Sequence, residues 1–178
     1  MTSRRVYLAL GSNLGDRREH LRAAIEELRA GGVAIDVVSA LYETPPWGVE
    51  DQPAFLNIAV DGASDLDARA LLVLAKRIEV ARGPAHGSEV ATVRWTARPL
   101  DIDIALIEGE TVDEPDLSVP HVLLAERSFV LVPLAEIAGD VVHARLGRSI
   151  AALRDARPPA ERDEVRQVET RGWESRAS

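Results

Sequence analysis

Asp101 and Asp103 are the residues whose types and spacing indicate chemistry most directly. They alternate with the aliphatic residues Leu100, Ile102 and Ile104. In an extended strand alternate residues share a face, so both carboxylates lie together while the aliphatic side chains point into a core. Such carboxylates hold hard cations such as Mg²⁺ together with phosphate oxygens and water. A solvated acidic face is the alternative, because the same alternation is typical of half-buried strands.

The residues just before this run favour a site for a metal-bound phosphate compound. Arg94 and Arg98 carry fork-shaped guanidinium groups that match phosphate oxygens. Trp95 lies between them and offers a flat ring for stacking. Together with the two carboxylates, these residues predict a metal–nucleotide site.

Short apolar and β-branched runs predict the strands that would position this site. They lie at Val6–Leu10, Val33–Tyr42, Phe55–Val60 and Leu100–Ile107. The sequence Glu108-Gly109-Glu110 indicates a hairpin turn that leads into Thr111-Val112.

Apolar residues at helical spacing predict two long helices between these strands. The first follows Asp16, its predicted N-cap, and ends at Gly31. The second takes Ser64 or Asp65 as its N-cap and ends at Gly83.

The C-terminal part of the chain predicts smaller additions. Leu124–Ile137 has helical character, with Pro133 as a kink or boundary, and Ser149–Arg154 predicts a short helix. Charged residues dominate residues 158–178, so we expect a frayed, flexible tail there, in which Trp173 has no explanation.

The predicted order of elements is strand, helix, strand, strand, helix, strand. This order is that of an α+β fold, the ferredoxin-like βαββαβ sandwich, here with C-terminal additions. A length of 178 residues predicts one domain, which we place at residues 1–157.

The composition limits the classes of function. With 46% hydrophobic and 28% charged residues, the chain is typical of globular proteins. No apolar run approaches the about 20 residues that span a bilayer, no signal peptide is visible, and there is no cysteine. We therefore expect a cytoplasmic protein that does not bind membranes. The net charge of −8 argues against a nonspecific nucleic-acid binder.

The segment Arg94-Trp95-x-x-Arg98-x-Leu100-Asp101-Ile102-Asp103 resembles the signature of the 6-hydroxymethyl-7,8-dihydropterin pyrophosphokinase family of folate-pathway enzymes. Further segments resemble this family in the same order, so the resemblance covers about Val6 to Leu153. They are Leu10–Gly15, Tyr42–Gly48, Asp51–Asn57, Val119–His121 and Glu126–Leu134.

The resemblance implies an ATP-dependent diphosphotransferase with a ferredoxin-like core. Such an enzyme transfers diphosphate from ATP to the hydroxymethyl group of 6-hydroxymethyl-7,8-dihydropterin and releases AMP, in folate biosynthesis. The implied ligands are ATP, the pterin and two Mg²⁺ ions held by Asp101 and Asp103, and we expect a monomer.

The resemblance also implies roles for individual residues. The implied catalytic residues are Arg94, Arg98, Asp101 and Asp103. Those implied to contact the nucleotide are Glu79, Arg98, Ile104, Ser118, His121 and Arg127. Those implied to bind the pterin are Thr44, Pro45, Trp47, Phe55, Asn57, Trp95 and Phe129, with the two phenylalanines on either side of the ring.

Residue types alone leave simpler interpretations open for four of these residues. Glu79 is placed to pair with Arg82 on the helix surface, and His121 to cap a turn. Arg127 fits a solvated helix face, and Phe129 fits a core. Two other functions also stay open: a ferredoxin-like module that binds a nucleotide or pterin without turnover, and a metal-dependent phosphohydrolase.

The chain departs from the family pattern near the signature. Thr96-Ala97 stands where the family usually has Gly-Pro, and Pro99 stands where it usually has Thr. The loop Gly83–Val93 is long and contains no arginine, although many family members place one there. Because long loops without periodicity often close over ligands, we predict a mobile lid over ATP.

Overall fold

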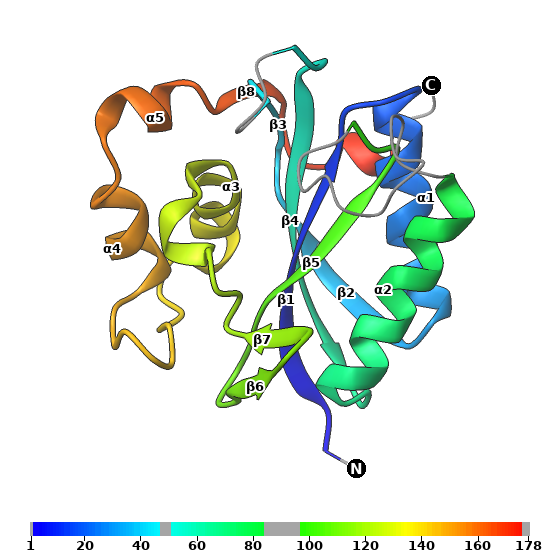
Figure 1. Ribbon diagram of the computed structural model, residues 1–178, viewed down its shortest axis with the longest axis vertical. Coiled ribbons are helices and arrows are strands. Elements are labelled where there is room, and N and C mark those ends of the chain that lie inside the picture. Colours follow the sequence, from blue (N-terminus) through cyan, green and yellow to red (C-terminus); the bar gives the residue numbers. More distant parts are fainter. Residues whose placement is uncertain (1, 47–50, 84–96, 176–178) are drawn as a thin grey trace.

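A six-stranded antiparallel sheet forms the centre of the computed structural model, which describes residues 2–46, 51–83 and 97–175. Five strands lie in the order β5-β1-β4-β3-β8, and β2 also pairs with β4 (Figure 1). The strands are β1 (Arg4–Ser12), β2 (Val33–Val38), β3 (Leu41–Thr44), β4 (Phe55–Ser64), β5 (Asp101–Ile107) and β8 (Arg166–Glu169).

Helices cover both faces of this sheet. The helices α1 (Arg17–Ala30) and α2 (Ala68–Arg82) cover one face, and α3 (Ser128–Ala138) covers the other (Figure 1). Along β1, Leu8 and Leu10 pack into the core beneath α1 and α2, whereas Tyr7 packs beneath α3. Leaving aside the C-terminal elements and treating β2 and β3 as one interrupted strand, the order is βαββαβ. The fold class is therefore confirmed as α+β and ferredoxin-like. None of the helices in the described ranges could cross a membrane, because none is both long and apolar enough.

The prediction of one continuous second strand is wrong, because the chain breaks between β2 and β3 at Ser39 and Ala40. Two distant side chains hold this break. Glu136 of α3 accepts hydrogen bonds from the backbone N–H of Ala40 at 3.1 Å and from the Tyr42 hydroxyl at 2.5 Å. The indole Nε1–H of Trp173 donates to the Ser39 carbonyl at 3.1 Å.

The helix caps agree with the sequence at α1 and differ at α2. Asp16 caps α1, as predicted. The N-cap of α2 is Asp67, whose side chain accepts the Ala70 N–H at 2.8 Å. The prediction that Ser64 or Asp65 is the N-cap is wrong, because β4 continues through Ser64 and α2 therefore begins later in the chain.

The strands β6 (Val112–Glu114) and β7 (Leu117–Val119) pair with each other in a separate two-stranded sheet. The predicted turn at Glu108–Gly109 is present, with the Glu110 N–H donating to the Ile107 carbonyl at 3.1 Å, but the prediction of a hairpin is wrong because β6 pairs with β7 and not with β5. One edge of β5 is paired with β1, and the backbone N–H of His121 bonds the Ala105 carbonyl at 2.8 Å. The peptide bond between Val119 and Pro120 is cis.

The predicted helix Leu124–Ile137 is interrupted at Arg127. A short 3₁₀ turn, Leu124–Glu126, comes first, Arg127 is extended, and α3 then begins at Ser128. Pro133 lies inside α3 and does not end it. The short helix predicted after Ser149 is α4 (Ile150–Asp155), and Ser149 is its N-cap.

The C-terminal residues form defined elements where we expected a frayed tail. They are α5 (Pro159–Asp163), β8, and a 3₁₀ turn at Trp173–Ser175. β8 pairs with β3, and Trp173 is completely buried. Charge content alone predicted disorder here, but a paired strand edge and a buried indole keep the segment folded onto the sheet.

Candidate active site

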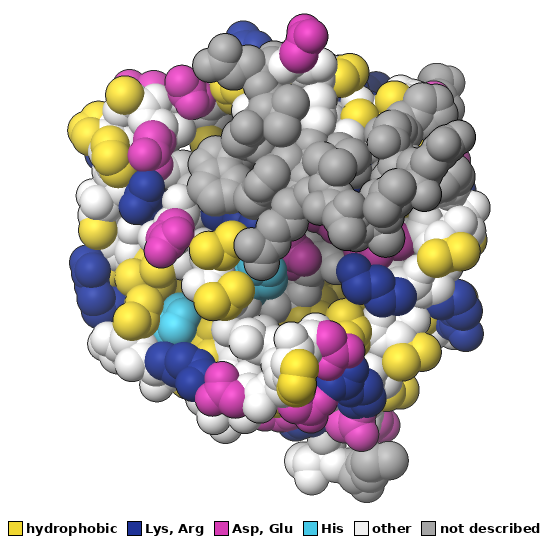
Figure 2. All heavy atoms as spheres, viewed as in Figure 1, with side chains coloured by type: hydrophobic (Ala, Val, Ile, Leu, Met, Phe, Trp, Pro, Cys, Tyr) yellow, Lys and Arg dark blue, Asp and Glu magenta, His cyan; other side chains and the backbone are white. Residues whose placement is uncertain are grey.

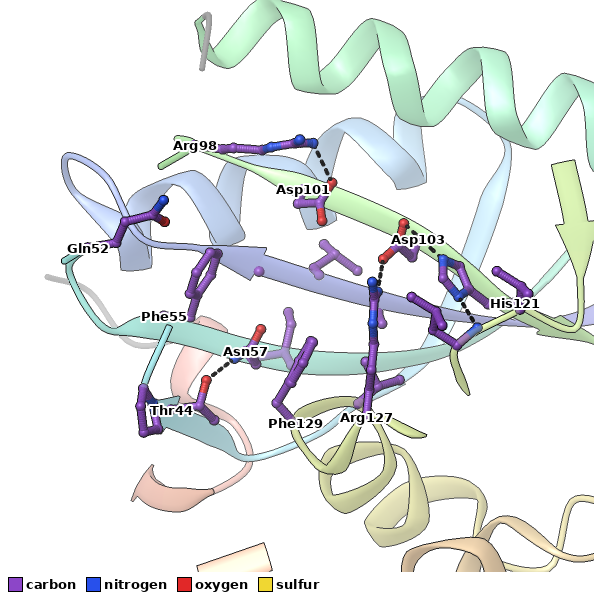
Figure 3. Close-up of a pocket in the computed structure, with 18 of the residues that line it drawn as sticks. Thr44, Gln52, Phe55, Asn57, Arg98, Asp101, Asp103, His121, Arg127 and Phe129 are labelled. Atoms are coloured by element: carbon purple, nitrogen blue, oxygen red, sulfur yellow. Dashed lines mark hydrogen bonds and ion pairs between the residues drawn. The ribbon is translucent and has the colours of Figure 1, made fainter. Parts of the chain in front are cut away.

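A cavity of about 300 Å³ lies between the sheet face that faces α3 and the start of α3 itself (Figure 3). In the space-filling view, a histidine and acidic side chains meet near the centre of this side of the molecule (Figure 2). The cavity brings together ten of the predicted site residues: Thr44, Pro45, Phe55, Asn57, Arg98, Asp101, Asp103, His121, Arg127 and Phe129.

The floor of the cavity is a row of residues that lie opposite one another on three strands. Gly11 of β1 pairs with Asp101 of β5 on one side and with Asn57 of β4 on the other. One step along, Ala9 pairs with Asp103. The two positions on the middle strand therefore have small side chains, which leaves space over the sheet between the amide and the carboxylates.

Gly11 lies so close to Asn57 that its position leaves no room for a side chain. A Cβ atom at Gly11 would lie 2.7 Å from Asn57 Oδ1 and 3.5 Å from Phe55 Cδ1. The first distance is shorter than real Cβ contacts, so any larger residue at this position would displace the Asn57 amide.

We expect Gly11→Ala to weaken binding of a ligand that hydrogen-bonds to Asn57 Oδ1 by about 5- to 10-fold, as for the loss of one hydrogen bond of roughly 1–1.4 kcal/mol. Titration of the variant with the pterin that the family resemblance implies measures this loss, and the melting temperature reports any general loss of stability. A pterin affinity within twofold of the parent would show that the position of the Asn57 amide does not matter for binding.

One end of the cavity combines aromatic rings with a buried amide. Phe55 projects from β4 and Phe129 from the start of α3, on either side of Asn57 in Figure 3. The Nδ2 of Asn57 donates to Thr44 Oγ1 at 2.7 Å, and both residues are buried. This bond fixes the orientation of the amide, so its Oδ1 lies toward the space over Gly11. A flat heterocycle with a donor on its edge is the ligand that such an arrangement suits.

The other end of the cavity is charged. The two carboxylates lie in long ion pairs: Arg98 Nη1 is 3.4 Å from Asp101 Oδ1, and Arg127 Nη1 is 3.5 Å from Asp103 Oδ2. His121 Nε2 is 3.8 Å from Asp103 Oδ1. Arginine and histidine donors beside two carboxylates form an arrangement that can bind phosphate oxygens and a cation together.

The surroundings of Asp103 disfavour its ionised form. Burial and the charge of Asp101 raise the pKa of Asp103 to about 7, although Arg127 acts in the opposite direction. A cation beside the two carboxylates would remove this repulsion and favour the ionised form.

His121 is neutral and has a defined tautomer. Burial and the positive charge of Arg127 lower the pKa of His121 to about 4. The backbone N–H of Leu123 donates to His121 Nδ1 at 3.1 Å, so the neutral ring carries its proton on Nε2. That Nε2–H faces Asp103, where it can donate to a bound oxygen. His121 thus caps a turn, as its simpler interpretation proposed, and also lines the cavity.

Glu79 of α2 lies behind the carboxylates, at the edge of β5 that faces away from β1. Its Oε1 accepts the backbone N–H of Ile102 at 2.8 Å, and Lys76 Nζ donates to its Oε2 at 3.1 Å. Burial and the charge of Asp101 raise the pKa of Glu79. The simpler interpretation of a pair with Arg82 is wrong, because Arg82 donates to Glu27 at 2.5 Å.

Of the five predicted residues that remain, two lie away from the cavity lining. The Ile104 side chain is buried on the opposite face of β5, in the core under α1 and α2. Ser118 lies on β7, opposite Asp113, and is half-buried. The other three, Trp47, Arg94 and Trp95, lie outside the described residues, as does most of the predicted lid.

The sequence reasoning missed Gln52, Lys76 and Asn13. Gln52 and Lys76 line the cavity. Asn13 is 1% exposed and joins two sides of the site: its Nδ2 donates to Gln52 Oε1 at 3.2 Å, and its Oδ1 accepts the Arg98 N–H at 2.8 Å. Asn13 and Gln52 are in segments that resemble the family, and Lys76 is the sole lysine of the sequence, but none stands in a pattern that indicates chemistry by itself.

Comparisons with known proteins agree with this geometry. Residues 7–139 match the family described as 7,8-dihydro-6-hydroxymethylpterin-pyrophosphokinase (HPPK). The chain is 46% identical over 139 residues to the 2-amino-4-hydroxy-6-hydroxymethyldihydropteridine pyrophosphokinase of Methylorubrum extorquens, covering 78% of this chain and 85% of that protein. It is 44% identical over 136 residues to the Bacillus subtilis protein of the same name, covering 76% and 78%.

A solved structure shares the fold. The crystal structure of wild-type Plasmodium falciparum HPPK-DHPS matches with a TM-score of 0.65 at 16% identity, covering 86% of this chain. This chain spans 44% of that longer protein. The match over residues 7–139 and the identities above 40% together show that the chain belongs to the 7,8-dihydro-6-hydroxymethylpterin-pyrophosphokinase family of diphosphotransferases.

Proposed function

We propose that this chain transfers diphosphate from ATP to the hydroxymethyl group of 6-hydroxymethyl-7,8-dihydropterin and releases AMP, as a step of folate biosynthesis. The observation that carries this proposal is that one cavity has an aromatic, amide-bearing end and a charged end, joined by the small residues Ala9 and Gly11. A pterin and a triphosphate fit these two ends in chemistry, and the reacting groups would meet between them.

At the aromatic end, Phe55 and Phe129 stack on the pterin ring while the Asn57 amide hydrogen-bonds to the edge of the ring. Thr44 and Pro45 form the adjacent wall. Stacking alone is tolerant of ring identity, so the fixed amide of Asn57 supplies the selectivity. Placing the ring holds its hydroxymethyl group close to the charged end, which replaces a bimolecular encounter with a positioned one.

At the charged end, Arg98, His121 and Arg127 bind oxygens of the triphosphate. The two arginines neutralise negative charge that develops as the bond to the leaving AMP breaks, and His121 donates through Nε2. The family resemblance further implies nucleotide contacts from Glu79, Ile104 and Ser118, although none of the three lines the described cavity and the Ile104 side chain lies in the opposite core. Arg94 adds to the phosphate contacts, and Trp47 and Trp95 add to the pterin contacts.

Asp101 and Asp103 suit Mg²⁺. Among the described residues, no group of three or more histidine, cysteine, aspartate or glutamate side chains is placed to hold a metal. Mg²⁺ is commonly held by one or two carboxylates, with phosphate oxygens and water completing its six ligands. The two carboxylates and the raised pKa of Asp103 fit that pattern. Two such ions would neutralise the phosphates and acidify the attacking hydroxyl.

We also propose that the enzyme works as a cytoplasmic monomer on these two small molecules. The lining described for the cavity comes from the strands of a single sheet and the segments beside them.

The test of the proposed function is the identity of the nucleotide product. With MgATP and the hydroxymethyl dihydropterin, we expect equal amounts of AMP and pterin diphosphate, resolved by chromatography and mass spectrometry. Formation of ADP, or of free phosphate with unmodified pterin, would identify a different kinase or a phosphohydrolase. Pterin binding without any product would identify a binding module.

A further inference from the structure

The C-terminal segment Arg166–Ser175 lies against the strand that forms one wall of the cavity. β8 pairs with β3 so that Gln167 is opposite Tyr42. Without β8, β3 would be paired only with β4 and would form an edge of the sheet. Thr44, the last residue of β3, and the following Pro45 both line the cavity. The segment therefore covers the outer side of a ligand-facing strand.

Trp173 anchors this segment at the break between β2 and β3. Its side chain is completely buried, and its Nε1–H donates to the Ser39 carbonyl at 3.1 Å. Ser39 is in turn fixed to β4, because its backbone N–H donates to the Ala59 carbonyl and its hydroxyl accepts the Ala59 N–H, both at 2.9 Å. Trp173 thus completes a buried junction from which β3 starts.

Two arginines of α1 hold the same segment from the other side. Arg22 Nη2 donates to the Trp173 carbonyl at 3.0 Å, and Arg18 forms an ion pair with Glu169 of β8. The segment therefore contacts α1, the break between β2 and β3, and β3 itself, and these contacts together fix its position.

A chain of ion pairs extends from β8 to the aromatic end of the cavity. Arg166 Nη2 donates to Glu43 Oε1 at 3.1 Å, and Arg17 Nη1 donates to Glu43 Oε2 at 3.2 Å. Arg17 Nη1 also donates to the Ala54 carbonyl at 2.8 Å, directly before Phe55. Through Glu43, β8 thus supports both β3 and the start of β4.

We propose that the segment Arg166–Ser175 positions the pterin-binding wall, with Trp173 as its main positioning residue; this inference rests on the proposed function. The position of β3 determines where Thr44 Oγ1 lies. Because this oxygen accepts a hydrogen bond from Asn57 Nδ2, it determines which atom of the Asn57 amide faces the ligand. The segment lies beyond residue 139, where the family match ends. It is therefore a support for the pterin site outside the matched part of this chain.

Two substitutions in the full chain test this role without removing the segment. Trp173→Phe keeps an aromatic ring in the buried position but removes the Nε1–H. Gln167→Pro removes a backbone N–H and restricts φ in β8, and Gln167→Ala is its matched control because Gln167 is exposed. Ile107→Val, a buried change near the far end of β5, is the control for a general loss of stability.

Two dissociation constants are measured: the Kd of the pterin in the presence of a nonhydrolysable ATP analogue and Mg²⁺, and the Kd of the analogue alone. The kinetic constants kcat and KM are measured as well. All measurements are made at a temperature at which every variant is folded. In Trp173→Phe and Gln167→Pro we expect the pterin Kd and KM to rise about 5- to 10-fold, as for one lost buried hydrogen bond. The analogue Kd should stay within about twofold, as should both Kd values in Gln167→Ala and Ile107→Val.

A pterin Kd within twofold of the parent in both test variants, with only a lower melting temperature, would overturn the positioning role. If the parent protein itself makes no AMP, the proposed function fails separately. Amide exchange in β3 then decides the inference without any ligand. Faster exchange in Gln167→Pro than in Gln167→Ala supports it, and equal exchange overturns it.

Discussion

Asp101→Asn and Asp103→Asn are each expected to slow diphosphate transfer by about 10²–10³-fold, or roughly 3–4 kcal/mol of transition-state stabilisation. Each substitution keeps the size of the side chain and removes one negative charge from the proposed Mg²⁺ site. Single-turnover rates at saturating MgATP and pterin measure the loss. Pterin binding measured without Mg²⁺ should barely change, because the aromatic end of the cavity is untouched.

Folding should respond in the opposite direction to activity. Without metal, the free energy of unfolding of both variants should stay level or rise, because two close like charges no longer repel. For Asp103 the raised pKa gives a pH dependence. An unfolded carboxyl titrates near 4, so the folded protein binds the extra proton between about pH 4 and pH 7, and the parent loses stability as pH rises through that range. The stability advantage of Asp103→Asn should therefore grow from about pH 4 to pH 7 and then level off.

The alternative interpretation of these residues makes a different prediction. If the alternation only marks a solvated strand face, both variants should turn over within a few-fold of the parent. That result would show that the charged end of the cavity is not where the phosphates react.

Removal of either aromatic ring is expected to weaken pterin binding by about 5- to 150-fold, as for the loss of one stacking contact of roughly 1–3 kcal/mol. The variants are Phe55→Ala and Phe129→Ala, with Phe55→Leu and Phe129→Leu as controls that keep apolar bulk without a ring. Equilibrium titration of the pterin measures the change. If stacking carries the affinity, the leucine variants should recover only part of it.

The two rings should differ in their effect on the nucleotide. The guanidinium carbon of Arg127 lies 5.6 Å from the centroid of the Phe129 ring, so Phe129→Ala also removes a surface against which Arg127 packs. We expect a weaker ATP-analogue affinity in Phe129→Ala and an unchanged one in Phe55→Ala. Full pterin affinity in both alanine variants would exclude the proposed ring sandwich.

The sequence predicted those parts of the fold that depend on local patterns. The alternation around Asp101 places both carboxylates on one face of β5, and Asp16 caps α1 as its position indicates. The break between β2 and β3 had no local signal, because no glycine or proline lies between Val33 and Tyr42. It is held by Glu136 and Trp173, which lie 96 and 134 residues further along the chain than their partners Ala40 and Ser39.

The site shows the same limit. The charged and aromatic residues could be chosen from the sequence because their types suit phosphate and a flat ring. Asn13 and Gln52 could not, because their role is to connect two loops through a buried amide. The C-terminal segment was predicted as a frayed tail since its charge content outweighed one tryptophan, yet Trp173 is buried where the strands separate.

The row formed by Asn57, Gly11 and Asp101 sets a fixed distance between the two ends of the proposed substrate site. The amide and the carboxylate belong to strands separated by one intervening strand, so two strand spacings, about 9–10 Å, lie between their backbones. Backbone hydrogen bonds between the strands keep this backbone distance constant, and side-chain motion changes it little. A single-ring pyrimidine with the same edge could satisfy Asn57, but its hydroxyl would stop short of the phosphates. With the pterin and the triphosphate bound as proposed, the enzyme would therefore discriminate among molecules by their length as well as by their hydrogen-bonding edge.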